Sequence, residues 1–222
     1  MDESFRYVFD LDDTLYAERD YVLSAFTSIS RSIAARFDIE DPKRRLRKLW
    51  DEGTANPIAV LWNELQLPED LRAEFIETMR AHPPSITLRP DAASLIERLR
   101  RAGLPYAIVT DGRSVTQRAK IAALGCLDAA YISISEEVGL AKTDPERFVD
   151  VERRLGPGKF VYIGDNPAKD FVAPNQRGWL TAMLSGSGAG IHPQTLPADA
   201  AYHPRVVGSN FAEIVTKLEA FR

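Results

Sequence analysis

Short apolar runs that alternate with helical patterns are the feature that most limits what this chain can fold into. The runs are rich in valine, isoleucine and aromatic residues, and most are separated by segments with helical spacing of apolar residues. Strands buried on both faces of a parallel sheet are nearly continuous in apolar residues, and strand–helix alternation is typical of an α/β fold. We predict a parallel sheet with strands at residues 7–9, 106–109, 131–134, 160–163 and 179–184, and a short edge strand at 204–207.

One long segment interrupts this alternation. From about residue 16 to residue 85 the sequence shows only helical periodicity, and two consecutive prolines, Pro83 and Pro84, end the block. Because the block directly follows the first predicted strand, it is interpreted as a helical insertion carried on two linkers. We therefore expect a small all-helical cap domain at residues 16–85 and a catalytic core made of residues 1–15 and 86–222.

The charge balance and the absence of targeting signals narrow the setting of the protein. Its 222 residues include 28 Lys and Arg against 32 Asp and Glu, a net charge of −4, which gives no electrostatic reason to expect a nucleic-acid partner. No apolar stretch is long enough to cross a bilayer, and the N-terminus lacks the apolar segment of a signal peptide. The single cysteine, Cys126, excludes an intramolecular disulfide and favours a reducing compartment. We expect a cytoplasmic monomer or homodimer without a membrane partner.

Two aspartates follow the first predicted strand. Asp10 and Asp12 come at its carboxyl end, which is where open α/β sheets place their ligand sites. Two residues apart on a continuing strand, their carboxylates would point the same way and would repel each other unless a cation or a shared proton intervened. Aspartate is also a common turn residue, so an acidic turn explains this pair equally well when it is taken alone.

A hydroxyl, backbone amides and a lysine follow two other predicted strands. The strand at 106–109 runs into Thr110, Asp111 and Gly112, a hydroxyl followed by backbone N–H groups that suit a phosphate oxygen. Lys142 lies in a loop after the strand at 131–134. Its ammonium group could supply a point charge to a phosphate.

Two further carboxylates follow the strand at 160–163. This strand runs into Gly164 and Asp165, and Asp170 comes five residues later. Asn166 and Pro167 have the pattern of an N-cap followed by proline. We therefore expect Asp165 at the tip of the strand and Asp170 in the first turn of the next helix.

These features resemble the four motifs of the haloacid dehalogenase superfamily, in the same order and next to the same predicted strands. The resemblance covers nearly the whole chain, and it implies a Rossmann-like, doubly wound parallel sheet with a helical cap inserted after the first strand. The matching positions are residues 10–14 for the first motif, Thr110 for the second, Lys142 for the third, and Gly164, Asp165 and Asp170 for the fourth.

The resemblance also implies a role for each matching residue. Asp10 would attack phosphorus and form an aspartyl-phosphate, and Asp12 would protonate the leaving oxygen and then activate the hydrolytic water. The phosphoryl oxygens would be held by Thr110, by the amides of Asp111 and Gly112, and by Lys142.

The metal implied by the resemblance is Mg²⁺. It would bind the carboxylates of Asp10 and Asp165, the backbone carbonyl of Asp12 and waters, with Asp170 either ligating directly or orienting those waters. Oxygen ligands and retained waters suit Mg²⁺ better than zinc. The three histidines are not spaced as a metal site, and they are expected in loops or at the surface.

Two residues depart from the pattern of the superfamily. Thr143 follows Lys142 where many relatives have proline, which affects the stiffness of the loop more than its charge. Asp111 stands where asparagine is frequent, but its backbone amide is retained. Phosphate binding is therefore expected to survive both changes.

The expected function is a Mg²⁺-dependent phosphatase of small phosphorylated metabolites. An acid at position 12 argues against a dehalogenase, which lacks one there. A hexose-phosphate mutase remains an alternative, because it uses the same two aspartates and a similar cap. A non-enzymatic phospho-receiver domain has similar chemistry but would be shorter and would lack the insertion. Substrate specificity is expected from cap residues near Tyr16, Arg19, Trp50 or Asn56.

Two other patterns have structural interpretations. The basic run at residues 43–48 keeps helical spacing of its apolar neighbours Leu46 and Leu49, so it is interpreted as a solvated helix face. The glycine-rich segment at 186–190 lacks the lysine of a phosphate-binding loop and is interpreted as a surface loop.

Overall fold

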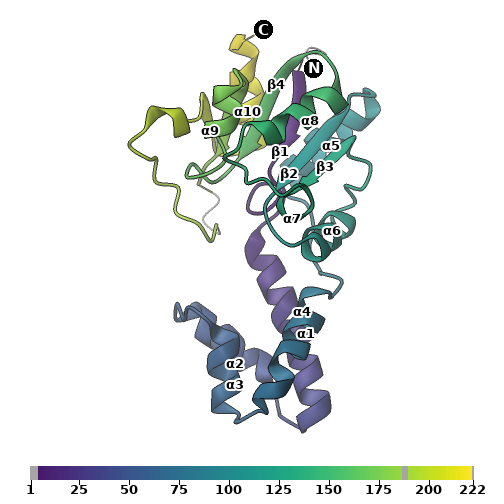
Figure 1. Cartoon of the computed structure of the whole chain (residues 1–222), viewed down its shortest axis with the longest axis vertical. Coiled ribbons are helices and arrows are strands. Elements are labelled where there is room, and N and C mark those ends of the chain that lie inside the picture. The colour runs from purple at the N-terminus through teal and green to yellow at the C-terminus, as the bar shows by residue number, and fades with distance from the viewer. Residues whose placement is uncertain (1–4, 187–189, 222) are drawn as a thin grey trace. The chain divides into compact units, whose positions relative to one another are not determined.

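The computed structural model describes residues 5–186 and 190–221, and the chain forms two compact units (Figure 1). Met1–Arg19 and Thr87–Arg222 make up one of them, called the core unit here, and Asp20–Ile86 make up the other, the helical unit. Residues 187–189 of the glycine-rich segment lie outside the described residues, so the prediction of a surface loop is not tested there.

A parallel sheet with the strand order β3-β2-β1-β4-β5-β6 forms the centre of the core unit. Each strand predicted from the sequence is present, and the last one is the expected short edge strand. The order reverses at β1, which pairs in parallel with β2 on one side and with β4 on the other. The strands are β1 (Phe5–Phe9), β2 (Tyr106–Thr110), β3 (Tyr131–Ile134), β4 (Lys159–Gly164), β5 (Leu180–Leu184) and β6 (Val206–Gly208).

Successive side chains of each strand point to opposite sides of the sheet. Helices cover both faces of the sheet and bury these side chains. On one face Tyr162 packs against Phe148 of α8 (Glu146–Leu155), with 5.7 Å between the ring centroids. On the other face Phe9 packs against Phe211 of α10 (Phe211–Leu218) at 6.0 Å. The α/β prediction is therefore confirmed. The remaining elements of the core unit are α5 (Pro90–Arg101), α6 (Ser114–Ala123), α7 (Ser135–Val138), α9 (Val172–Gln176) and 3₁₀ turns at Ala200–Tyr202 and Glu219–Phe221.

The helical unit is built around its own apolar cluster. Every residue of this unit is described, and none lies in a strand. Trp62 is fully buried in the cluster and packs edge-on against Phe75 at 5.3 Å, and its indole N–H donates to the carbonyl of Pro68. The elements are α1 (Glu18–Phe37), whose first two residues belong to the core unit, α2 (Pro42–Asp51), α3 (Pro57–Glu64), a 3₁₀ turn at Glu69–Leu71 and α4 (Arg72–Arg80).

Aspartate and asparagine begin two of these helices. Asp41 and Asn56 accept hydrogen bonds from backbone N–H groups of α2 and α3, and a proline follows each of them. Asn56, one of the residues near which specificity was expected, therefore caps α3. Trp50, another of them, packs against the apolar cluster of the helical unit.

Smaller predictions are settled by burial. The basic run at 43–48 lies in α2, which buries Leu46 and Leu49 and exposes Lys43, so the solvated helix face is confirmed. Cys126 is buried and free. His82 lies in the loop after α4, as expected, but it is buried there and hydrogen-bonded to Ser24 at 2.9 Å. Among the described residues, no helix combines the length and the apolar character needed to cross a membrane.

Candidate active site

The candidate site lies at the carboxyl end of the strands, where the strand order reverses. Asp10 directly follows β1, Thr110 is the last residue of β2, and Asp165 directly follows β4. Because β1 lies between β2 and β4, these three residues meet at one edge of the sheet. This is the position at which open α/β sheets bind their ligands.

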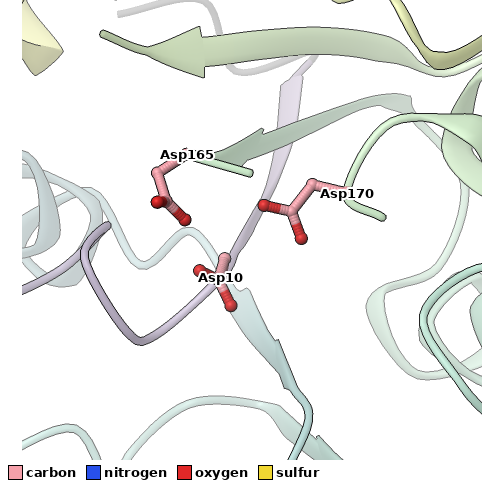
Figure 2. A group of neighbouring side chains, drawn as sticks. All are labelled: Asp10, Asp165 and Asp170. Carbon is pink, nitrogen blue, oxygen red and sulfur yellow. The ribbon is translucent and has the colours of Figure 1, made fainter. Parts of the chain in front are cut away.

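Three buried carboxylates converge there, as Figure 2 shows. Asp10, Asp165 and Asp170 each offer an oxygen, and these oxygens all lie within 4.8 Å of one another. Burial and then the neighbouring negative charges raise the pKa of Asp165 to about 9. Burial, together with Asp170 and against the opposing effect of Lys142, raises the pKa of Asp10 to about 6. A cation among these oxygens would relieve both effects, and hard oxygen ligands fit Mg²⁺.

Asp170 is held in the cluster by a tight turn. Its Oδ2 accepts the N–H of Asn166 at 2.8 Å, and its own N–H donates to the carbonyl of Asn166. The expected helix start at Asn166 and Pro167 is wrong, because this turn closes on itself and α9 begins only at Val172. Gly164 makes the approach possible, since a Cβ there would lie 2.5 Å from Asp170 Oδ2.

Lys142 lies beside these carboxylates and is 1% exposed. Its Nζ donates to Asp10 Oδ1 in a short contact and to Asp170 Oδ1 at 3.0 Å. Burial alone would lower the pKa of Lys142, but Asp10 and Asp170 outweigh it and raise that pKa well above its ordinary value. The lysine is therefore charged, and it neutralises part of the cluster. Thr14 completes the surroundings of Asp10 by donating its hydroxyl to Oδ2 at 3.0 Å.

The carboxylate of Asp12 has different partners, which lie on α6 and on the loop after β1. Its Oδ1 accepts from Lys120 Nζ at 2.7 Å and from the hydroxyl of Tyr16, and its Oδ2 accepts from Gln117 Nε2 at 2.8 Å. Burial would raise the pKa of Asp12, but Lys120, with Tyr16 and Gln117, lowers it below its usual value. Asp12 is thus an ionised carboxylate outside the three-aspartate cluster.

The loop after β2 is fixed by a buried arginine. The Asp111 carboxylate pairs with Arg147 of α8, whose guanidinium also donates to the carbonyl of Thr110 at 2.5 Å and to that of Leu140 at 3.2 Å. The same group donates to both the hydroxyl and the carbonyl of Ser133 at 3.0 Å. One side chain therefore joins three segments near the site.

The remaining predicted contact, Gly112, has a partner within the protein. Its N–H donates to the hydroxyl of Ser135 at 2.9 Å.

A small polar cavity brings most of the predicted residues together. Its volume is about 90 Å³, well below the ~300–1,000 Å³ of sites for larger ligands. Glu18 and His192 line it, 3.8 Å apart, and burial followed by the nearby charge of Asp12 raises the pKa of Glu18 to about 7. The rest of the lining is Asp10, Asp12, Thr110, Asp111, Lys142, Asp165 and Lys169.

Several residues with site contacts were missed from the sequence, among them Gln117, Lys120 and Arg147. A signal for them existed in the helical periodicity. Arg147 is spaced with Val151 and Leu155 on the buried stripe of α8, and Gln117 and Lys120 share the buried face of α6 with Ile121. A polar residue on an apolar helix face indicates a buried partner.

The comparisons with known proteins identify the class. The family model for haloacid dehalogenase-like hydrolases matches residues 7–176. The chain belongs to this family, and it has the fold and the buried aspartates described above.

Curated relatives indicate the type of hydrolase. The chain is 28% identical over 191 residues to glyceraldehyde 3-phosphate phosphatase of Methanopyrus kandleri, a match that covers 80% of this chain and 82% of the relative. It is 31% identical over 128 residues to hexitol phosphatase A of Escherichia coli, covering 55% and 53%. The chain is therefore a hydrolase, and its relatives place it with the phosphatases of the family.

Solved structures share the fold. The magnesium-bound HAD-hydrolase YfnB of Bacillus subtilis superposes with a TM-score of 0.63 at 21% identity, covering 96% of this chain and 98% of the other. The 2-haloacid dehalogenase of Pseudomonas syringae gives 0.64 at 20% identity, covering 98% and 100%. Because a dehalogenase shares this fold, the fold alone does not define the reaction, and the side chains of the site have to define it.

Proposed function

We propose that this chain is a Mg²⁺-dependent phosphatase of small phosphorylated metabolites and that it works through an aspartyl-phosphate on Asp10. The observation that carries the proposal is the convergence of Asp10, Asp165 and Asp170 beside Lys142, at a cavity that Asp12 also lines. Curated phosphatases for glyceraldehyde 3-phosphate, phosphoserine and hexitol phosphates are among its relatives, and all three names describe small phosphomonoesters.

The proposed metal ligands are the carboxylates of Asp10 and Asp165 and the carbonyl of Asp12, with Asp170 binding directly or through water. When bound, Mg²⁺ would offset the negative charge of the phosphate and of the attacking carboxylate. Lys142 contributes a second positive charge, and it is already in contact with Asp10 and Asp170.

The reaction has two steps. In the first, a carboxylate oxygen of Asp10 forms a bond to phosphorus and the bond to the ester oxygen breaks. Asp12, which is ionised in the absence of substrate, would have to take up a proton before this step and then give it to the leaving oxygen. In the second, Asp12 accepts a proton from water as the water oxygen attacks phosphorus, the bond between phosphorus and the Asp10 oxygen breaks, and phosphate leaves with the Asp10 carboxylate restored. Thr110, the amide of Asp111 and Lys142 bind the phosphoryl oxygens in both steps, and the amide of Gly112 would join them on exchanging its bond to Ser135 for one to the substrate.

The helical unit is proposed to act as a cap that excludes water and limits the size of the substrate. Small phosphorylated metabolites should therefore be hydrolysed well, and folded phosphoproteins poorly. Side-by-side assays of a metabolite panel and a phosphoprotein test this, and efficient release from the phosphoprotein would contradict the cap.

The decisive experiment separates the two aspartates of the first motif. Asp10→Asn removes the nucleophile, so no phosphoenzyme should form. Asp12→Asn, assayed with 4-nitrophenyl phosphate, should release nitrophenol rapidly up to about one equivalent per site and then turn over slowly, because this good leaving group needs little acid help while the second step still needs a base. The mass of the peptide that contains Asp10 should increase by a phosphoryl group. A burst from Asp10→Asn, or label on another residue, would refute the assignment.

A mutase of the same superfamily is distinguished by its product. The wild-type protein should release free phosphate from sugar monophosphates in the presence of Mg²⁺. Isomerised sugar phosphate without phosphate release would favour the mutase.

A further inference from the structure

We infer that Gln117 and Lys120 of α6 are positioning residues for proton transfer, with the Gln117 amide tying Asp12 to the phosphate-binding hydroxyl of Thr110. The inference rests on the proposed phosphatase function. Both residues lie outside the motifs that carry the family resemblance, and both are nearly fully buried, at 2% and 3% exposure.

The amide nitrogen of Gln117 serves both neighbours at once. Nε2 lies 2.8 Å from Asp12 Oδ2 and 2.6 Å from Thr110 Oγ1. A primary amide nitrogen carries two N–H donors, whereas its oxygen can only accept. The opposite orientation of the amide would direct its oxygen at the Asp12 carboxylate. The carboxylate therefore selects the orientation in which the two N–H groups reach Asp12 and Thr110.

This contact sets the direction in which Thr110 donates. Because Thr110 Oγ1 accepts an N–H from Gln117, the hydrogen of its own hydroxyl is directed to another acceptor. In the proposed reaction that acceptor is a phosphoryl oxygen. Gln117 thus makes Thr110 a donor toward the substrate and holds the proton-transfer carboxylate in the same arrangement.

Lys120 fixes the other oxygen of Asp12. Its Nζ lies 2.7 Å from Asp12 Oδ1, with side-chain exposures of 4% and 20% for the pair. A buried charge of this kind is tolerated only when it is paired and hydrogen-bonded. With Tyr16 also on Oδ1 and Gln117 on Oδ2, the plane of the carboxylate is set by three donors.

The local sequence allows α6 to deliver both side chains. Positions 117 and 120 are three residues apart and therefore lie on one face of the helix. Gly112 leaves room for the first of them, since a Cβ there would lie 3.1 Å from both Cγ and Cδ of Gln117, and its φ of +143° disfavours other residues.

The test compares two leaving groups in four variants. Gln117→Met and Lys120→Met should lower kcat for glyceraldehyde 3-phosphate by about 10-fold to 10²-fold, part of the 10²–10⁴ that proton transfer contributes. The first step with 4-nitrophenyl phosphate should be much less affected, so that a burst of nitrophenol precedes slow turnover. Lys120→Arg keeps the charge and should recover most of the rate. Arg118→Met, on the same helix but at an exposed ion pair with Glu137, is the matched control.

A merely structural role gives a different result. In that case Gln117→Met and Lys120→Met would slow the hydrolysis of both substrates equally, no burst would appear, and Lys120→Arg would not recover activity. This pattern would overturn the inference, and so would wild-type kinetics in both Met variants. The thermal shift produced by Mg²⁺ should stay as in the wild type, because the hydrogen bonds by which these residues act go to Asp12 and Thr110 and not to the three-aspartate cluster. Wild-type protein without turnover would overturn the proposed function as well, whereas an active wild type matched by both Met variants would overturn this inference alone.

Discussion

Replacing Arg147 with methionine should be one of the most destabilising single changes in the core unit. The guanidinium is buried at 2% exposure and donates to the backbone carbonyls of Thr110, Ser133 and Leu140, to the Ser133 hydroxyl and to the Asp111 carboxylate. Methionine fills much of the same volume but donates nothing. The acceptors would remain buried without these donors, because the strands and loops that carry them cannot move into water.

The magnitude follows from those acceptors. A buried acceptor that loses its donor costs about 1–3 kcal/mol, and breaking a buried charge pair costs about 3–5 kcal/mol. Asp111 keeps 27% side-chain exposure, so water can solvate part of its charge and the lower end of the second range applies. Since the losses share one side chain and are not additive, we expect a decrease of about 3–5 kcal/mol in the free energy of unfolding. For a chain of this length that corresponds to a Tm lower by about 6–20 °C.

Thermal and urea unfolding followed by circular dichroism measure this change. Arg153→Met is the matched control, because Arg153 lies on the same helix with 70% side-chain exposure and pairs with Asp150 at the surface; its effect should stay within about 0.5 kcal/mol. Asp111→Asn in the Arg147→Met background should restore part of the stability by removing the unpaired charge. If Arg147→Met unfolds within about 1 kcal/mol of the wild type, the proposed cost of the lost donors is wrong.

Three further predictions concern the carboxylate cluster. Without metal, the pKa values of Asp165 and Asp10 in the folded protein are about 9 and about 6, above the ordinary 3.8, so the folded protein binds more protons than the unfolded chain. The free energy of unfolding should therefore fall as pH rises from about 4 to 9. For the same reason Mg²⁺ should bind more tightly at pH 8.5 than at pH 6, and a pH-independent Kd by calorimetry would contradict this. Gly164→Ala should displace Asp170 and weaken the Tm increase produced by Mg²⁺; an unchanged increase would show that Asp170 is not needed for binding. Lys142→Ala should lower kcat/KM by about 10²–10³, and a wild-type value would remove Lys142 from phosphate binding.

The sequence alone was sufficient to predict where the strands lie and which aspartates follow them. Hydrophobic runs and helical periodicity are local properties of the chain, and parallel strands bring their carboxyl ends to one edge. Asp10 and Asp165 could therefore be placed near each other without coordinates. The position of Asp170 near them was also predicted, but it lies in a turn and not in the predicted helix. That turn depends on the carboxylate of Asp170 accepting the N–H of Asn166, a contact that local sequence patterns do not show.

Only the tertiary structure decided which polar side chains support that edge. Lys120 meets Asp12 across 108 positions of the chain, and Arg147 meets Asp111 across 36. Helical periodicity shows that such a residue lies on a buried face, but it does not show which loop reaches it. That partner is set by the strand order and by the packing of α6 and α8 on the sheet, which place segments distant in the sequence within hydrogen-bonding distance.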